Sequence, residues 1–233
     1  MLRLVPIGNP YILFVVLIII AVMLTVCNSF FSKPAVIKRK LKKTIKKKIS
    51  TFQEGEVGKV VGSITYAGKV LTAPLSGRKC VYYQIKVEVI RFSGPTASSR
   101  WHDIINEEVA SDVVIKNGSD YALIETGLVK AHLIPDEEYY CSTRNDVTPK
   151  LEEYLKKHGR TRIGLFRIYK SLRFAEGVLE EGEIIGVAGK GNWKRKDQIN
   201  LKIPSSRILV MGPDGNEPLY LSDDPETTES ENT

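Results

Sequence analysis

The stretch from Val81 to Ile90, Val-Tyr-Tyr-Gln-Ile-Lys-Val-Glu-Val-Ile, decides the fold class of this chain. Every second residue from Val81 onward is apolar or aromatic, and most of the residues between them are polar. An alternation of period two is typical of a β-strand that buries one face. We therefore expect a strand over 81–90 whose apolar face lies against a core.

Further strands are expected on both sides of this stretch. Asn117-Gly118 separates two apolar runs, and both of these residue types tolerate the positive φ of a tight hairpin turn. The other apolar runs of strand length are 57–66, 129–133, 167–174, 184–188, 208–211 and 219–221. So many short strands predict a domain that is mostly β and largely antiparallel.

A single well-defined helix is expected over 149–158. Thr148 can cap its first turn, and Pro149 suits the first helical position, where its missing N–H is not needed. Gly159 can end the helix in a left-handed conformation. The β-rich region is therefore predicted to be of the α+β kind.

The N-terminal region carries the strongest local signal in the sequence. Residues 11–31 contain no charged side chain, and Ile12–Val26 is dominated by Ile, Val, Leu and Phe. A helix needs roughly 20 apolar residues to cross a bilayer, whereas the apolar part of a cleaved signal peptide has roughly 7–15. We therefore expect a transmembrane helix over 11–31 that is not cleaved.

The charge of the chain is distributed unevenly. The net charge is +7, but the first 50 residues contain ten Lys or Arg and no Asp or Glu, whereas the stretch after Arg207 contains seven acidic residues and no Lys or Arg. The cations after the apolar segment predict a cytoplasmic domain and an N-terminus on the outer side. The residues expected to lie at the membrane surface are Lys38, Arg39, Lys40, Lys42, Lys43, Lys46, Lys47 and Lys48.

Two interpretations of the basic segment stay open. Ile37, Leu41, Ile45 and Ile49 recur every four residues, which on a helix gives an apolar stripe surrounded by lysines. Such a helix would lie on an anionic lipid surface, where each lysine contributes about 1 kcal/mol. The alternative is a topology signal that acts as a solvated spacer. Binding to nucleic acid is not expected, because the basic charge is confined to this segment beside an apolar helix.

These observations predict five regions and one fold class. The fold class is an N-terminal transmembrane helix plus a mostly-β (α+β) domain of antiparallel strands with one well-defined helix. The regions are a short N-terminal segment (1–10), the transmembrane helix (11–31), a polybasic segment (32–50), the β-rich domain (51–222) and an acidic disordered tail (223–233).

Cysteine and histidine usage argues against a metal centre. The chain has three cysteines and three histidines, with no Cys-x-x-Cys and no shared ligand spacing. Cys80 is expected to be a buried thiol, and Cys141 to lie in a surface connection.

Gly186–Gly191 has glycines spaced as in a phosphate loop, but without Gly-Lys-Ser/Thr order a hairpin turn is the better interpretation. No catalytic, cofactor-binding or metal-binding residue is predicted.

Several blocks in the β-rich region occur in a characteristic order. They are Gly58–Ile64, Leu71–Tyr83, Trp101, Val114–Ser119, the helix at 149–158, Arg173–Glu183 and Pro218–Ser222. Together these blocks resemble the GIDE domain, also called the BAM ("beside a membrane") domain, over roughly 52–222. The resemblance implies a membrane-associated, mostly-β domain that senses or binds partners next to a bilayer.

The best-known eukaryotic relatives implied by this resemblance are mitochondrial E3 ubiquitin ligases. In those proteins the domain lies between two transmembrane helices, and a C-terminal RING carries out the ligase chemistry. The 233 residues contain neither a second apolar span nor the roughly eight Cys and His ligands of a RING. We therefore expect a non-catalytic interaction or sensing domain. The alternative is a component of a ubiquitin-ligase-type system whose RING lies on another chain.

Three residues are candidates for recognition of a partner. Trp101 follows the first long strand and can present an aromatic surface, although a core position is the alternative. Arg173 and Glu176 belong to one of the blocks of the resemblance, where they either line a binding surface or pair with each other. The expected partners are a lipid bilayer with its anionic headgroups and a protein whose identity the sequence does not give.

Overall fold

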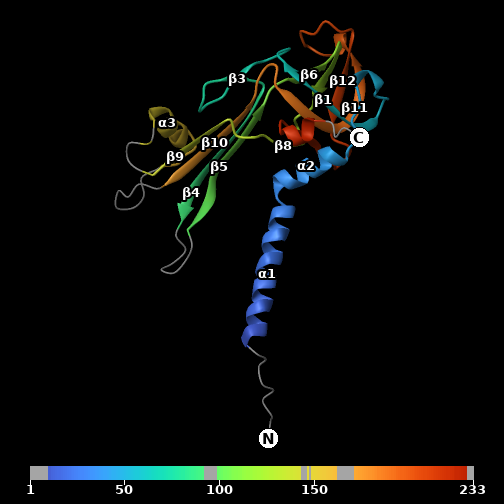
Figure 1. Cartoon of the computed structure of the whole chain (residues 1–233). Helices are drawn as coiled ribbons and strands as arrows, with labels where there is room; N and C mark the ends of the chain where they lie inside the picture. The colour runs from blue at the N-terminus through green and yellow to red at the C-terminus, as the bar shows by residue number, and fades with distance from the viewer. Residues whose placement is uncertain (1–9, 92–98, 143–145, 147, 162–170, 230–233) are drawn as a thin grey trace.

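The computed structural model describes residues 10–91, 99–142, 146, 148–161 and 171–229 (Figure 1). In the N-terminal helix it describes the side chains of residues 11, 13–25 and 30. Two sheets make up the domain, and the N-terminal helix projects away from both of them (Figure 1). The domain is mostly β, and the strand predicted from residue 167 lies partly outside the described residues, because 162–170 is not described.

Five strands of the larger sheet form a closed ring. The order is β1-β6-β7-β12-β11, and β11 returns to pair with β1 in antiparallel register from Glu56↔Gly191 to Ser63↔Ile184. Apolar side chains from all five strands fill the ring and form the first core. The bounds are β1 (Glu56–Thr65), β6 (Val113–Asn117), β7 (Asp120–Ile124), β11 (Ile184–Arg195) and β12 (Arg207–Gly212).

Two strands extend this sheet beyond the ring. β13 (Leu219–Ser222) pairs with β11 at Gly186–Ala188, and β8 (Val129–His132) pairs with β13. The β8–β13 and β7–β12 pairs are parallel, whereas the sequence analysis expected antiparallel strands. Parallel pairing is a property of the chain path between distant strands, which the alternation within one strand does not encode.

The strand β11 is crowded because it pairs with three other strands, β1, β12 and β13. Its glycines lie where a side chain would collide with a neighbour. A Cβ atom at Gly189 would lie 2.5 Å from the carbonyl oxygen of Gly212, and one at Gly191 would lie 2.8 Å from the Phe52 ring. The hairpin turn expected at Gly186–Gly191 is therefore wrong, since these residues lie inside a continuous strand. Close backbone approach, and not a turn or a phosphate loop, explains the glycines.

The smaller sheet has four antiparallel strands in the order β5-β4-β10-β9. Its bounds are β4 (Tyr82–Arg91), β5 (Arg100–Ala110), β9 (Glu137–Cys141) and β10 (Leu172–Leu179). The alternation predicted for 81–90 is confirmed, because Tyr83, Ile85, Val87 and Val89 all enter the second core. The opposite face of this sheet carries Gln84, Lys86 and Glu88, and we call it the outer face. A two-stranded ribbon of β2 (Leu71–Thr72) and β3 (Lys79–Cys80) accompanies the two sheets.

The helix α3 (Pro149–Lys157) packs on the face of the four-stranded sheet that carries the second core, opposite the outer face (Figure 1). The hydroxyl of Thr148 accepts a hydrogen bond from the Leu151 amide at 3.4 Å, which confirms the predicted cap. Leu151, Tyr154 and Leu155 are buried in the second core. That core also contains both Cys80 and Cys141, so the surface position expected for Cys141 is wrong, because the side chain ends β9 on the buried side.

The helix α1 (Pro10–Phe30) stands apart from the domain (Figure 1). Within the part of the chain that the structure describes, no helix combines the length and the apolar character needed to cross a membrane. The predicted transmembrane helix over 11–31 is therefore corrected.

The rest of the fold-class prediction needs two further corrections. In the described part of the chain, α2 (Lys33–Lys43) and α4 (Pro225–Thr228) are helical in addition to α1 and α3. The tail predicted to be disordered from residue 223 is folded up to 229, whereas 230–233 lies outside the described residues. Ser222 and Thr227 are fully buried, and this burial orders a segment whose composition alone suggested disorder.

Candidate functional site: a basic helix held by the acidic C-terminal segment

The basic helix α2 packs against the domain through its apolar side. Ser32 caps its first turn by accepting a hydrogen bond from the Ala35 amide at 3.4 Å. Ile37 and Leu41 are fully buried and form a small core with Ala188 and Tyr220. The apolar side of α2 therefore faces protein, which corrects the interpretation in which this side lies on lipid.

The predicted stripe breaks up after α2. The helix ends at Lys43, so the four-residue spacing no longer places later side chains on the same face. Ile45 is exposed, and Ile49 enters the first core together with the side chains of the closed ring. Packing against the strands has therefore divided a stripe that appears continuous in the sequence.

Four of the eight predicted surface cations are paired with carboxylates of the domain. The amine of Lys38 lies 2.5 Å from Asp224, that of Lys40 2.5 Å from Glu217, and that of Lys42 2.8 Å from Glu226. Lys47 pairs with Glu56. Half of these cations are thus neutralised by the chain itself, and three of the four partners lie in the acidic C-terminal segment.

The other four cations are placed differently. The Arg39 guanidinium lies 3.9 Å from the centre of the Phe30 ring and donates a hydrogen bond to the Phe30 carbonyl at 3.0 Å, which ties α2 to the end of α1. Lys43, Lys46 and Lys48 have no ion-pair partner among the described residues. Among the described residues, these three lysines and Arg39 are the predicted surface cations without a carboxylate partner.

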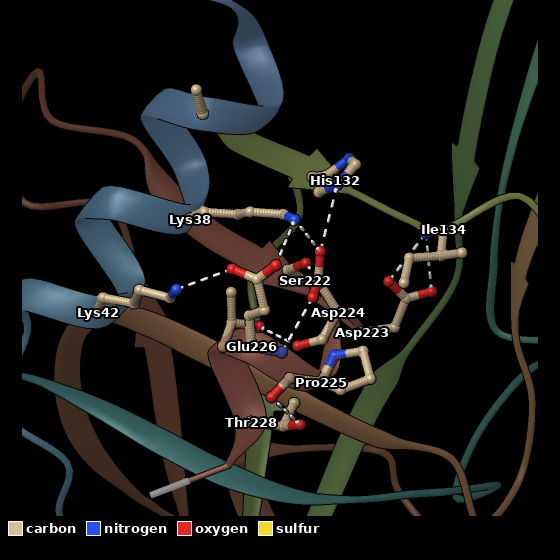
Figure 2. A network of polar contacts seen from close by, with 12 residues as sticks. Lys38, Lys42, His132, Ile134, Ser222, Asp223, Asp224, Pro225, Glu226 and Thr228 are labelled. Atoms are coloured by element: carbon tan, nitrogen blue, oxygen red, sulfur yellow. Dashed lines mark hydrogen bonds and ion pairs between the residues drawn. The ribbon is translucent and has the colours of Figure 1, made fainter. Parts of the chain in front are cut away.

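Asp224 is the centre of the network in Figure 2. Its carboxylate caps α4 by accepting a hydrogen bond from the Glu226 amide at 2.9 Å, and it also faces Lys38. Burial acts to raise the pKa of Asp224, but the hydrogen bonds from Lys38 and the Glu226 amide outweigh burial and lower it. The same pair raises the pKa of Lys38, so both groups are charged at neutral pH.

The surroundings of Asp224 hold it in place. The imidazole of His132 lies 3.8 Å from the Asp224 carboxylate, and burial, together with the charge of Lys38, lowers the pKa of His132. The Asp224 amide donates a hydrogen bond to the Ser222 hydroxyl at 3.1 Å, and the Thr227 hydroxyl donates one to the Asp224 carbonyl at 2.7 Å. The segment 222–227 is therefore held by hydrogen bonds within itself as well as by the ion pair with α2.

Asp223 points to a different partner from Asp224, as Figure 2 shows. Its carboxylate accepts a hydrogen bond from the Ile134 amide at 2.9 Å. Burial raises the pKa of Asp223 to about 7, and the nearby carboxylates of Glu183 and Asp136 act in the same direction. Two adjacent aspartates thus have opposite pKa shifts, because burial dominates at Asp223, whereas hydrogen bonds from Lys38 and the Glu226 amide dominate at Asp224.

The structure brings two of the three predicted recognition residues together. The Arg173 guanidinium on β10 lies 5.0 Å from the centre of the Trp101 ring on β5, across the outer face. Trp101 is half-buried on this face and belongs to none of the cores. Arg173 also pairs with the buried Glu88 at 2.5 Å. Lys86 then lies 2.9 Å from Glu88 and 3.1 Å from Asp103, which extends the row of ion pairs along the sheet.

Glu176 lies on the opposite face of the same strand. It is fully buried, and its carboxylate accepts hydrogen bonds from the amides of Leu75 at 2.8 Å and Ser76 at 2.7 Å. It does not pair with Arg173, so that interpretation is wrong, because positions 173 and 176 of a strand point to opposite faces. Glu176 fixes the loop before β3 and does not line a binding surface.

A groove of about 320 Å³ lies where the outer face meets β8 and the start of α2. The row of ion pairs leads into it through Lys86 and Asp103. The sequence analysis missed this groove, since no local pattern joins its five segments. It is lined by Lys33, Pro34, Gln84, Ile85, Lys86, Asp103, Asn106, Ala131, His132, Leu133, Pro135, Ala175 and Gly177.

The sequence analysis also missed the acidic partners of α2. Glu217, Asp224 and Glu226 carried one usable signal, which is that the acidic C-terminal stretch has the opposite charge to the basic segment. Nothing in the sequence showed that these two stretches meet. Among the described residues, no group of three or more His, Cys, Asp or Glu side chains is arranged to hold a metal ion.

Comparisons with protein-family models, with curated proteins and with solved structures find no match to this chain. The resemblance to the GIDE/BAM domain therefore stays a prediction.

Proposed function

We propose that this chain is a membrane-associated, non-catalytic interaction domain. In this proposal α1 associates with lipid, the domain lies on the cytoplasmic side of the membrane, and the outer face of the four-stranded sheet recognises a protein partner. The GIDE/BAM resemblance implies the same class of function.

The observation that carries the proposal is the contrast between two consecutive helices. Every large apolar side chain described in α1 is exposed, from 43% for Val16 to 77% for Tyr11. In α2, which begins at Lys33, the apolar side chains Ile37 and Leu41 are fully buried. A helix that is apolar on all sides requires an apolar environment, and the domain does not supply one. Lipid is the environment that such a helix fits best.

The charge around α2 supports the same placement. Lys43 ends α2, which is joined to α1 through Arg39 and Phe30, and Lys46 and Lys48 follow α2 in the chain. Anionic lipids of the cytoplasmic leaflet attract such lysines by about 1 kcal/mol each. The domain would then lie next to the bilayer in an orientation fixed by the packing of α2.

The outer face has the features of a recognition surface. Aromatic and arginine side chains dominate the energetics of protein interfaces, and Trp101 and Arg173 meet on this face. The groove beside Lys33 and Lys86 provides a concave surface next to them. A partner that uses both would contact residues from β4, β5, β8 and α2 at once.

Flotation on a density gradient tests the membrane part of the proposal. The full chain is expected to float with phosphatidylcholine vesicles that contain phosphatidylserine. The Ile18→Lys/Val22→Lys variant should lose flotation, because it places two charges in α1. The matched control is Ile45→Lys, which changes an apolar side chain that is exposed outside α1. A wild-type chain that stays at the bottom, or an α1 variant that still floats, would contradict the proposal.

Crosslinked affinity capture from native membranes tests the recognition part. The full chain and residues 1–50 serve as baits, and mass spectrometry identifies what each retains. A partner retained by the full chain alone should be lost with Trp101→Ala and kept with Val70→Ala, which changes an exposed side chain away from the outer face. The same partners on both baits would contradict a recognition role. Capture of a RING or E2-like partner would favour the ligase-component alternative, which rests on the resemblance alone.

A further inference from the structure

We propose that Lys40 and Lys42 each form an exchange site for an anionic lipid headgroup, which the chain's own Glu217 and Glu226 occupy in this structure. The inference rests on the proposed function, because association of α1 with lipid is what brings α2 to the headgroups. It goes further by assigning different roles to lysines that look equivalent in the sequence.

Exposure separates the exchangeable pairs from the fixed one. The side chains of Lys40 and Glu217 are 49% and 50% exposed, and those of Lys42 and Glu226 are 44% and 59% exposed. In contrast, the side chain of Asp224, which lies 2.5 Å from Lys38, is only 7% exposed; Lys38 also lies 3.5 Å from Glu226. Exposed ion pairs contribute little to stability, so another anion can replace their carboxylates easily. Removing Lys38 from Asp224 would leave a buried carboxylate without its counter-charge, so this pair stays closed.

A cavity beside Lys40 provides room for the incoming group. It measures about 220 Å³ and lies between the end of α2 and the strands β11 and β13. Glu217 is at its rim and is held by Lys40 at 2.5 Å and by the Tyr220 hydroxyl at 2.9 Å. When the exposed Glu217 side chain turns away, both donors face a phosphate in its place. Asp214 also lines the cavity, but it is paired with Lys190 at 3.0 Å.

Exchange does not require α2 to leave the domain. Ile37 and Leu41 hold the helix by burial of apolar surface, which is independent of the ion pairs. Lys40 and Lys42 need only new rotamers to turn from a carboxylate to a headgroup. Arg39 meanwhile stays on Phe30 and keeps α2 at the end of α1. The structure therefore combines a fixed helix with exchangeable charges.

¹³C NMR signals of individual lysines test this inference on the full chain. Reductive ¹³C-dimethylation keeps each lysine cationic and gives one signal per side chain, assigned by Lys→Arg variants. The chain is placed in nanodiscs of phosphatidylcholine alone or with phosphatidylserine. We expect the signals of Lys40 and Lys42 to shift as the phosphatidylserine fraction rises, whereas the signal of Lys38 stays in place.

A charge-neutral variant sharpens the test. In Glu217→Gln/Glu226→Gln the competing carboxylates are gone, so half of the shift should be reached at a phosphatidylserine fraction about fivefold lower. The matched control is Glu152→Gln/Glu153→Gln, which removes two exposed carboxylates from α3 and should respond like the wild type. Inorganic phosphate added to phosphatidylcholine nanodiscs distinguishes a free anion from a headgroup, and it should produce no shift at millimolar concentration.

Three results would overturn the inference. They are signals of Lys40 and Lys42 that ignore phosphatidylserine, a shift of Lys38 equal to theirs, and an equal shift with inorganic phosphate. If the chain floats with vesicles but these signals do not move, the exchange site is wrong and the proposed function stands. A chain that does not float contradicts the proposed function itself.

Discussion

The amine of Lys38 lies 2.5 Å from the carboxylate of Asp224, so a residue of the basic segment binds one of the acidic C-terminal segment. The pair sits at the junction of α2, β8 and α4, where the Asp224 side chain is almost completely buried. It therefore links α2 to the segment that follows the last strand, β13. The orientation of α2 on the domain depends on this pair together with the apolar contacts of Ile37 and Leu41.

Replacing Lys38 should destabilise the domain more than replacing another lysine of α2. In Lys38→Met the buried Asp224 loses its counter-charge, which we expect to lower the free energy of unfolding by about 1–2 kcal/mol, a value reduced for the partial exposure of Lys38. Lys43→Met, at an exposed position, should change it by less than about 0.5 kcal/mol. Urea unfolding in a neutral detergent measures both, and equal stabilities would contradict the role of the pair.

Glu176 should be sensitive to the loss of its charge. In Glu176→Gln one side-chain oxygen becomes an NH₂ group that faces a backbone N–H, so one of the two hydrogen bonds from Leu75 and Ser76 is lost inside the domain. We expect the free energy of unfolding to fall by about 2–3 kcal/mol. The control Glu153→Gln, on the exposed face of α3, should behave like the wild type. A Glu176→Gln variant as stable as its control would show that the loop does not need the carboxylate.

Asp223 should make stability depend on pH near neutrality. Its pKa is raised to about 7 in the folded domain, above the ordinary value of 3.8, so between these values the folded state holds a proton that the unfolded state has released. This contribution to stability is fully present below about pH 4 and is lost as the pH rises through 7. Stability of the wild type should therefore decrease toward pH 8.

The variant Asp223→Asn isolates this effect. Asparagine keeps a side-chain oxygen for the Ile134 amide and does not ionise. Its stability relative to the wild type should increase by about 1–2 kcal/mol between pH 5 and pH 8, a range reduced for partial solvent access. Urea unfolding at a series of pH values provides the comparison. Parallel curves for the two proteins would mean that Asp223 does not titrate in this range.

Gly189 should tolerate no side chain. A Cβ atom there would lie 2.5 Å from the carbonyl oxygen of Gly212, so the β11–β12 pair would have to separate. We expect Gly189→Ala to cost about 2–4 kcal/mol. Gly127→Ala is the matched control, because a Cβ at that position would meet nothing within 4 Å. Thermal unfolding of the two variants should differ clearly, and similar midpoints would argue against the crowding of β11.

The sequence was most informative where local chemistry decides the conformation. The alternation of 81–90, the Asn117-Gly118 hairpin and the Thr148–Pro149 start of α3 all agree with the structure. In each case a few adjacent residues determine the backbone through side-chain period, positive φ or capping. These features depend little on the rest of the chain.

The sequence was misleading where a distant segment decides the environment. Only Ile37 and Leu41 of the four-residue stripe are buried against Ala188 and Tyr220, and the glycines of 186–191 lie inside a strand. The pattern shows that a side chain will be covered but not what covers it. Burial of Ser222 and Thr227 likewise ordered a tail whose composition suggested disorder.

The amino-acid sequence by itself determined the mostly-β character, the position of α3 and the separation of charge between the two ends of the chain. Only the tertiary structure decided that these charges meet, that Trp101 lies beside Arg173 and that Glu176 faces away from both. The physical reason is the distance along the chain over which each kind of interaction acts. Strand period, turn conformation and capping act over a few residues, whereas ion pairs and buried contacts join whichever segments the closed ring and the four-stranded sheet bring together.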